Sequence, residues 1–220
     1  MPVQLHRGGR WRTWLGARFG GGAELGDRIW RRTLHCIGAI VLVYYLLPPR
    51  FFLVLSNEEA LLLALLAVLA LELLRHGAGL ELPTIRPWER HRVASYAYFA
   101  VALVVAVLAF PQPIAVAVVL GTAFIDPLIG ELRLRPHTPK RWLWGIPWAL
   151  FGLLTLIALL AVGRWALGPA LLAAAVAAAI AVAVERPKLP YYDDDLAMVL
   201  VPGLALTLAV WLWPGLPHAF

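Results

Sequence analysis

The chain has 220 residues, of which 61% are hydrophobic and only 15% are charged. Soluble domains carry about 25% charged residues, so this chain has too little polar surface to cover a water-soluble globule. The same composition excludes an intrinsically disordered chain, and the single cysteine excludes an intramolecular disulfide. The sequence is therefore that of an integral membrane protein, and its net charge of +6 bears on membrane orientation rather than on nucleic-acid binding.

Seven apolar stretches approach the roughly 20 helical residues that are needed to cross a bilayer. They lie at 33–47, 58–75, 92–110, 113–131, 142–162, 166–185 and 196–213, separated by prolines and glycines that end helices. We therefore expect an all-α, polytopic membrane protein with a bundle of about seven transmembrane helices over 28–220. A basic, glycine-rich cytoplasmic segment over 1–27 precedes this domain. The sixth stretch is almost entirely alanine and valine, and we expect it to be central because small residues let helices pack closely.

Basic residues fall on one side of this topology. Every lysine and arginine except Arg50 and Arg164 lies in the N-terminal segment or near the connections after the second, fourth and sixth stretches. The positive-inside rule then places the N-terminus in the cytoplasm and the C-terminus outside a multi-pass cell-membrane protein. Most carboxylates lie on the same side, which favours a site that faces the cytoplasm.

Two groups of carboxylates are candidates for chemistry. Asp126 is the most deeply placed acidic residue, and a carboxylate there needs a cation, a metal or a proton. The run Asp193-Asp194-Asp195 repels itself unless it is solvated or holds a cation such as Mg²⁺. Structural alternatives exist: Asp126 as a protonated or arginine-paired group, the acidic run as a solvated turn that caps the last helix at Asp195, and His35 as a packed polar residue.

Familiar nucleotide-binding and metalloprotease signatures do not occur in the sequence. It contains no phosphate loop, no Gly-x-Gly-x-x-Gly and no His-Glu-x-x-His. His91 and Ser95 are one helical turn apart, but no third group supports a hydrolase. Clustered arginines and carboxylates remain, and these groups bind phosphate together with its magnesium.

Five short motifs follow one another on the expected cytoplasmic side. They are Arg31-Arg32-Thr33-Leu34-His35, Glu72-Leu73-Leu74-Arg75, Arg86-Pro87-Trp88-Glu89-Arg90, Asp126-Pro127-Leu128-Ile129-Gly130, and Glu185 followed by Asp193-Asp194-Asp195-Leu196. In this order, over roughly 28–202, the chain resembles the CTP-dependent lipid-alcohol kinases, which comprise dolichol, phytol and diacylglycerol kinases of the polyprenol kinase type.

The resemblance implies an integral membrane kinase that transfers a phosphoryl group from CTP to a polyprenol, dolichol, phytol or diacylglycerol at the cytoplasmic interface. It implies Mg²⁺ as cofactor and CTP as co-substrate. The catalytic residues that it implies are Asp126, Asp194, Asp195 and His35. Metal binding is implied for Asp126, Asp193, Asp194 and Glu185, and nucleotide or phosphate binding for Arg32, Arg75, Arg86, Glu89, Arg90 and Lys140.

Two other functions are open. One is a CTP-dependent lipid-phosphate cytidylyltransferase or another phospholipid-synthesis enzyme, and the other is a noncatalytic lipid-binding or transport protein. An enzyme needs Asp126 to face one cavity with the acidic run at 193–195, whereas a scaffold would pair it with arginine and leave no cavity. Expected partners are a lipid alcohol, a nucleotide and membrane lipids, without nucleic acid, and homo-oligomerisation is left open.

Overall fold

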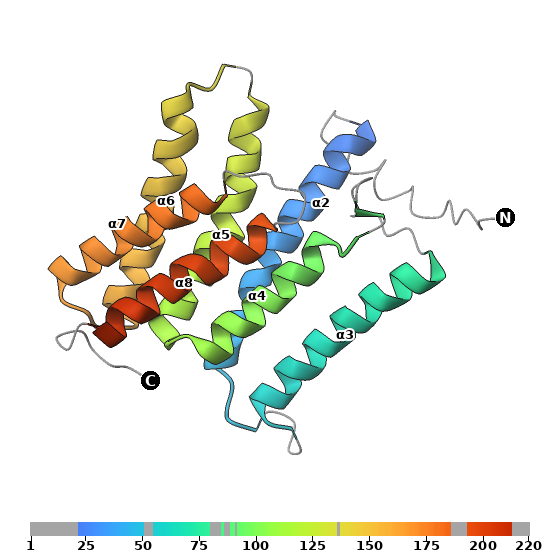
Figure 1. Cartoon of the computed structure of the whole chain (residues 1–220), viewed down its shortest axis with the longest axis horizontal. Coiled ribbons are helices and arrows are strands. Elements are labelled where there is room, and N and C mark those ends of the chain that lie inside the picture. Colours follow the sequence, from blue (N-terminus) through green and yellow to red (C-terminus); the bar gives the residue numbers. More distant parts are fainter. Residues whose placement is uncertain are drawn as a thin grey trace.

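A computed structural model describes residues 22–50, 55–79, 85, 89–90, 92–135, 137–185 and 193–212 (Figure 1). Within these residues the structure is helical and contains no β-strand. The elements are α2 (Gly22–Gly38), the 3-10 helix η1 (Ala39–Tyr45), α3 (Asn57–Ala78), α4 (Ser95–Ala109), α5 (Gln112–Leu134), α6 (Lys140–Ala161), α7 (Leu167–Val184) and α8 (Asp194–Leu212). The all-α prediction is confirmed for this part of the chain.

Five of the described helices are long and apolar enough to cross a membrane, namely α3, α5, α6, α7 and α8. The third expected stretch forms α4, which is apolar but has only 15 residues. The first expected stretch is divided between the end of α2 and η1. A multi-pass architecture therefore agrees with the structure, whereas seven crossings remain a prediction. The expected segment 1–27 lies outside the described residues up to residue 21, and its last residues already belong to α2.

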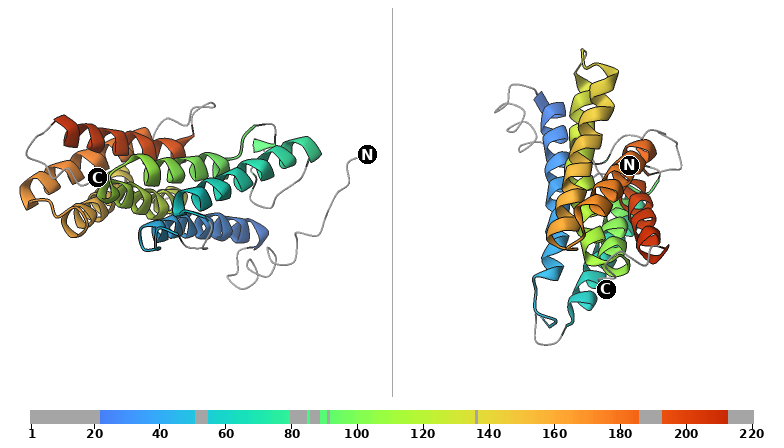
Figure 2. Two further views of the ribbon diagram at one scale, coloured as in Figure 1. Left: turned by 90° about the horizontal axis from the view of Figure 1, so that it is seen from below. Right: turned by 90° about the vertical axis from the view of Figure 1, so that its left-hand side faces the viewer.

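The centre of the bundle is α5. Its most apolar window is 61% buried inside the protein, compared with 33% for α7 and 11% for α3. It packs against α6, α8 and α2, whereas α7 lies beyond it against α6 and α8 (Figures 1 and 2). The expectation that the alanine-rich stretch is central is wrong. Small side chains permit close packing, but they do not determine how many neighbours a helix has.

Close packing of α5 on α6 depends on a glycine. A Cβ atom at Gly121 would clash with one edge of the Phe151 ring, which is completely buried, because its distance to both Cδ2 and Cζ would be 2.7 Å. The same arrangement joins α8 to α4, where Gly203 lies against the ring of Phe110. Each glycine thus lets an aromatic side chain of the neighbouring helix fill the interface, as small residues do in membrane helix pairs.

At the edge of the bundle, α3 lies alongside α4 (Figures 1 and 2). It begins with a capping box: Ser56 Oγ accepts a hydrogen bond from the Glu59 N–H, and the Glu59 carboxylate accepts one from the Ser56 N–H. It ends at Gly79, whose φ of 62° is in the left-handed region that glycine adopts without strain. Most of its side chains are exposed, so in a membrane α3 offers most of its surface to lipid.

Candidate functional site

A cavity of about 670 Å³ lies between α2, α4, α5 and α8, with α3 forming a side wall. Its carboxylates are Glu89, Asp126, Glu185, Asp194 and Asp195. Its basic groups are Arg28, Arg31, Arg32, His35 and Arg133. Apolar lining comes from Trp30, Leu34, Val68, Leu71, Phe99 and Ala100. The cavity therefore combines a highly charged part with a hydrocarbon-like part.

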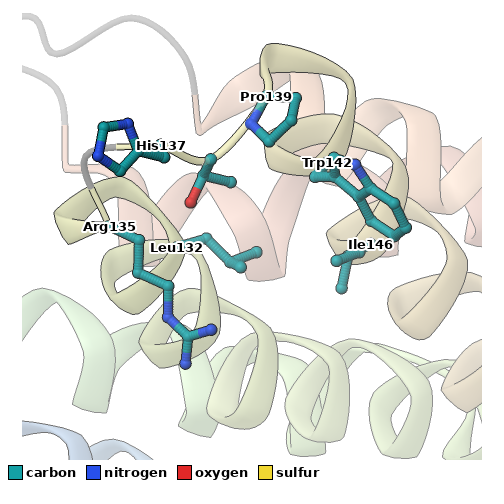
Figure 3. A pocket seen from close by; sticks show the side chains of 7 residues that line it. Leu132, Arg135, His137, Pro139, Trp142 and Ile146 are labelled. Atoms are coloured by element: carbon teal, nitrogen blue, oxygen red, sulfur yellow. The ribbon is translucent and has the colours of Figure 1, made fainter.

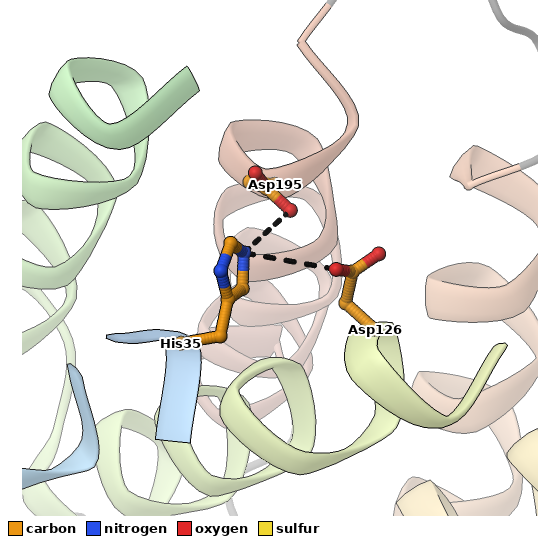
Figure 4. A group of neighbouring side chains, drawn as sticks. All are labelled: His35, Asp126 and Asp195. Atoms are coloured by element: carbon orange, nitrogen blue, oxygen red, sulfur yellow. Dashed lines mark ion pairs between the residues drawn. The ribbon is translucent and has the colours of Figure 1, made fainter. Parts of the chain in front are cut away.

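Three polar side chains from three helices converge in the charged part (Figure 4). His35 of α2 places Nε2 at 3.1 Å from Oδ1 of Asp195 and at 3.7 Å from Oδ2 of Asp126. Ser95, at the start of α4, donates a hydrogen bond of 2.5 Å to the other oxygen of Asp195. The His35 ring stacks on Phe99, with centroids 4.5 Å apart and planes inclined by 14°. Helices α2, α4, α5 and α8 thus meet at one polar cluster.

Asp126 also belongs to a second group, which consists of three carboxylates. One oxygen each of Asp126, Glu185 and Asp194 lies within 4.8 Å of the other two, and the ligand atoms of His35, Asp126 and Asp195 are equally close together. Carboxylates at such separations repel one another unless a cation or a proton lies among them. Magnesium prefers oxygen ligands of this kind together with phosphate oxygens. The donor set of Asp126, Glu185 and Asp194 is therefore one that could hold a divalent cation, and the metal role that the resemblance implies for these three residues stays a prediction.

Glu185 is the most buried of these carboxylates, with 2% of its surface exposed. It follows the last turn of α7 and accepts two hydrogen bonds of 2.6 Å from Nη1 and Nη2 of Arg133 on α5. Such a bidentate pair fixes the orientation of both planar groups. Arg133 is 37% exposed and also lines the cavity, so a cationic side chain lies directly beside the carboxylate group.

One face of α2 brings a row of arginines to the cavity. Arg28, Arg31 and Arg32 all line it, and Arg32 also forms an ion pair with Glu131 of α5. Burial, together with the positive charges of Arg28 and Arg31, lowers the pKa of Arg32. Cations held this close together are stabilised by an anion, and phosphate suits the fork geometry of guanidinium groups.

The acidic run at the start of α8 divides into two parts. Asp193 is the cap, because its Oδ1 accepts a 3.0 Å hydrogen bond from the Leu196 N–H. Burial, with the negative charges of Asp195 and Asp194, raises the pKa of Asp193 to about 6. Asp194 and Asp195 instead line the cavity. The cap that the structural alternative places at Asp195 is therefore formed by Asp193, whose predicted metal role stays a prediction.

Arg75 lies outside the cavity lining, in contrast to its predicted phosphate-binding role. Only 3% of its surface is exposed, and its Nε and Nη2 donate hydrogen bonds of 2.8 and 2.6 Å to Glu72. Its Nη2 also donates to the Arg92 carbonyl at 2.7 Å. Glu72 accepts two more hydrogen bonds, from the Ala94 N–H at 2.8 Å and the Tyr96 hydroxyl at 2.6 Å. The pair therefore holds the segment that leads into α4, and the phosphate-binding role of Arg75 has no support from the cavity lining.

The other predicted phosphate-binding residues are dispersed. Glu89 is buried and lines the cavity, whereas Arg90 and Lys140 do not belong to its described lining. Arg86 lies outside the described residues. Lys140 begins α6, close in sequence to a second, more open hollow of about 420 Å³ at the turn between α5 and α6 (Figure 3). This hollow is lined by Leu132, Arg135, His137, Thr138, Pro139, Trp142 and Ile146, without a carboxylate among them.

Sequence reasoning did not find three contributors to the site. The sequence places Ser95 one helical turn after His91, which lies outside the described residues, and soon after the motif at 86–90, but neither position indicates its hydrogen bond to Asp195. Arg133 orients Glu185, and Phe99 supports His35. Their partners are tens of residues away along the chain, so no local spacing could have indicated them.

Comparisons of the chain with protein-family models, with curated proteins and with solved structures found no match.

Proposed function

We propose that the protein is an integral membrane kinase that transfers a phosphoryl group from CTP to a lipid alcohol. The observation that carries this proposal is the convergence of Asp126, Glu185 and Asp194 in a cavity that is arginine-rich on one side and apolar on the other. A nucleoside triphosphate and its magnesium need the charged, arginine-rich side of this cavity. The hydrocarbon chain of a lipid acceptor needs the apolar side.

Charge complementarity supports the phosphate part of the proposal. The residues that would hold Mg²⁺ are Asp126, Glu185 and Asp194, and Arg28, Arg31, Arg32 and Arg133 line the same cavity. When bound, the ion would neutralise the negative charge of the triphosphate. The arginines would orient the phosphates, and in a partly buried cavity such fixed charges stabilise developing charge more strongly than water does.

The cluster around His35 supports a role in activating the acceptor. In the transfer, the acceptor hydroxyl oxygen bonds to the γ-phosphorus while the bond from that phosphorus to its bridging oxygen breaks, and CDP leaves. The hydroxyl proton must pass to a nearby base, for which His35 and Asp195 are the two candidates. Ser95 holds Asp195 in place through its hydrogen bond, so the geometry of the pair is set before substrate binds.

Membrane orientation belongs to the proposal as well. The cavity takes its residues from the end of the bundle where the arginines concentrate, and the positive-inside rule assigns this end to the cytoplasm. CTP is supplied from that side. Seven crossings, with the N-terminus inside and the C-terminus outside, complete the proposed topology.

The test is a transfer assay with protein reconstituted in nanodiscs, a polyprenol, Mg²⁺ and CTP labelled at the γ-phosphate. We expect labelled polyprenyl phosphate, and we expect Asp126→Asn to lower the rate by about 100-fold or more, because the carboxylate group would lose a negative charge that holds Mg²⁺, the ion that would neutralise the transferring phosphate. Glu58→Gln, at the far end of α3, is the matched control and should leave the rate unchanged.

Two results would contradict the kinase proposal. Label from the α-phosphate of CTP in the lipid product would identify a cytidylyltransferase, because that enzyme keeps the nucleotide in its product. No transfer from CTP, ATP, GTP or UTP to any lipid alcohol would favour the noncatalytic alternative.

A further inference from the structure

We propose that the hydrocarbon chain of the acceptor enters the cavity sideways from the bilayer, between α2 and α3, and lies against Val68 and Leu71 of α3. This inference rests on the proposed function and assigns two specificity-determining residues to it. Val68 and Leu71 are here called the α3 wall.

One residue of the α3 wall combines a cavity-lining position with high exposure. Leu71 lines the cavity and is nevertheless 42% exposed, so it lies at the rim. In the described residues α3 packs chiefly against α4, and only 11% of its apolar window is buried. A rim on a membrane-spanning helix of this kind faces acyl chains rather than water.

The depth of the α3 wall suits a lipid whose head lies at the membrane surface. Leu71 is seven residues from the end of α3 at Ala78, about 10 Å along the helix axis, and Val68 lies about 4.5 Å deeper. These positions correspond to the inner part of one leaflet of a hydrocarbon core about 30 Å thick, with Val68 close to the midplane. A chain that contacts them can therefore keep its hydroxyl near the charged end of the bundle.

Apolar surface continues from the α3 wall to the polar cluster of His35, Asp126 and Asp195. Phe99 lines the same cavity and stacks on His35, whose Nε2 lies 3.1 Å from Asp195. On the opposite side Trp30 and Leu34, four residues apart on α2, share one helix face and line the cavity too. A chain lying between these surfaces is enclosed by apolar side chains, and its terminal hydroxyl points to His35 and Asp195.

Steric blocking tests the inference through kinetics. We expect Leu71→Trp and Val68→Trp to lower kcat/KM for a long-chain polyprenol by at least about tenfold, while KM for CTP and the rate with a short, water-soluble isoprenoid alcohol stay unchanged. Leu73→Trp is the matched control, because Leu73 is 74% exposed on the same helix and does not line the cavity. Equal losses for the long and the short alcohol, or an equal effect of Leu73→Trp, would overturn the inference.

Photo-crosslinking provides a second readout that does not depend on activity or on any variant folding. A polyprenol with a diazirine in its chain is irradiated with the wild-type protein in nanodiscs, without nucleotide, and the adducts are mapped by mass spectrometry. We expect adducts on Val68, Leu71 or Phe99, and few with a diazirine phospholipid that lacks the hydroxyl.

The two readouts separate the two proposals. Adducts at these positions without any phosphoryl transfer would mean that the kinase proposal fails while the lateral path holds. Transfer with adducts only on other surfaces, or equal labelling by the phospholipid, would mean that the lateral path fails.

Discussion

Removal of the Glu72 side chain should destabilise the fold by an amount that follows from its contacts. Its carboxylate accepts four hydrogen bonds: two from Arg75, one from the Ala94 N–H and one from the Tyr96 hydroxyl. Both members of the ion pair are almost completely buried, with 4% and 3% of their surfaces exposed. Glu72→Ala therefore leaves the Arg75 guanidinium buried without its counter-charge.

The expected cost is about 3–5 kcal/mol of the free energy of unfolding, the range observed when one partner of a buried ion pair is removed. Replacing both partners by leucine leaves no buried charge, so the double variant Glu72→Leu, Arg75→Leu should regain part of this loss. Because the pair also holds the backbone before Ser95, we expect Glu72→Ala to weaken the contact between Ser95 and Asp195 as well.

The measurement is denaturant or thermal unfolding of the purified protein in detergent, monitored by circular dichroism. Glu58→Ala is the control, because this exposed residue lies in the first turn of the same helix and should change stability by less than about 0.5 kcal/mol. A loss below about 1 kcal/mol for Glu72→Ala, or a double variant no more stable than the single one, would refute the reasoning.

Two further predictions concern packing and capping. Gly121→Ala should destabilise the fold by about 1–3 kcal/mol, because the new methyl group meets the buried ring of Phe151. Gly145→Ala is the control: it has open space around it and should be neutral or slightly stabilising in the same unfolding assay. Asp193→Ala should lower the free energy of unfolding by about 1 kcal/mol, because the α8 cap is lost. Asp193→Asn keeps a capping oxygen and should be about as stable as the wild type. Equal losses for both variants would contradict the capping role.

Tertiary packing explains why parts of the site prediction needed correction. Glu72 and Arg75 are three residues apart, and their spacing correctly indicates a shared helix face, but only the position of α4 turns that face into a buried clamp. Asp193, Asp194 and Asp195 form one acidic run, and their spacing does not show which way each side chain points. In the structure the start of α8 separates them, because one faces its own backbone and two face the cavity.

Hydrophobic patterning located most of the membrane-spanning helices correctly. The apolar stretch expected at 58–75 is α3 at Asn57–Ala78, 113–131 is α5 at Gln112–Leu134, and 166–185 is α7 at Leu167–Val184. The length of an apolar stretch and the position of prolines are local properties of the sequence, so they predict a helix without knowledge of the helices that pack against it. Tertiary structure alone decided that α5 is central, that Glu185 meets Asp126 and that Phe99 supports His35. Those outcomes depend on the rotation of each helix about its axis and on its choice of partners, which arise from contacts between residues far apart in the chain.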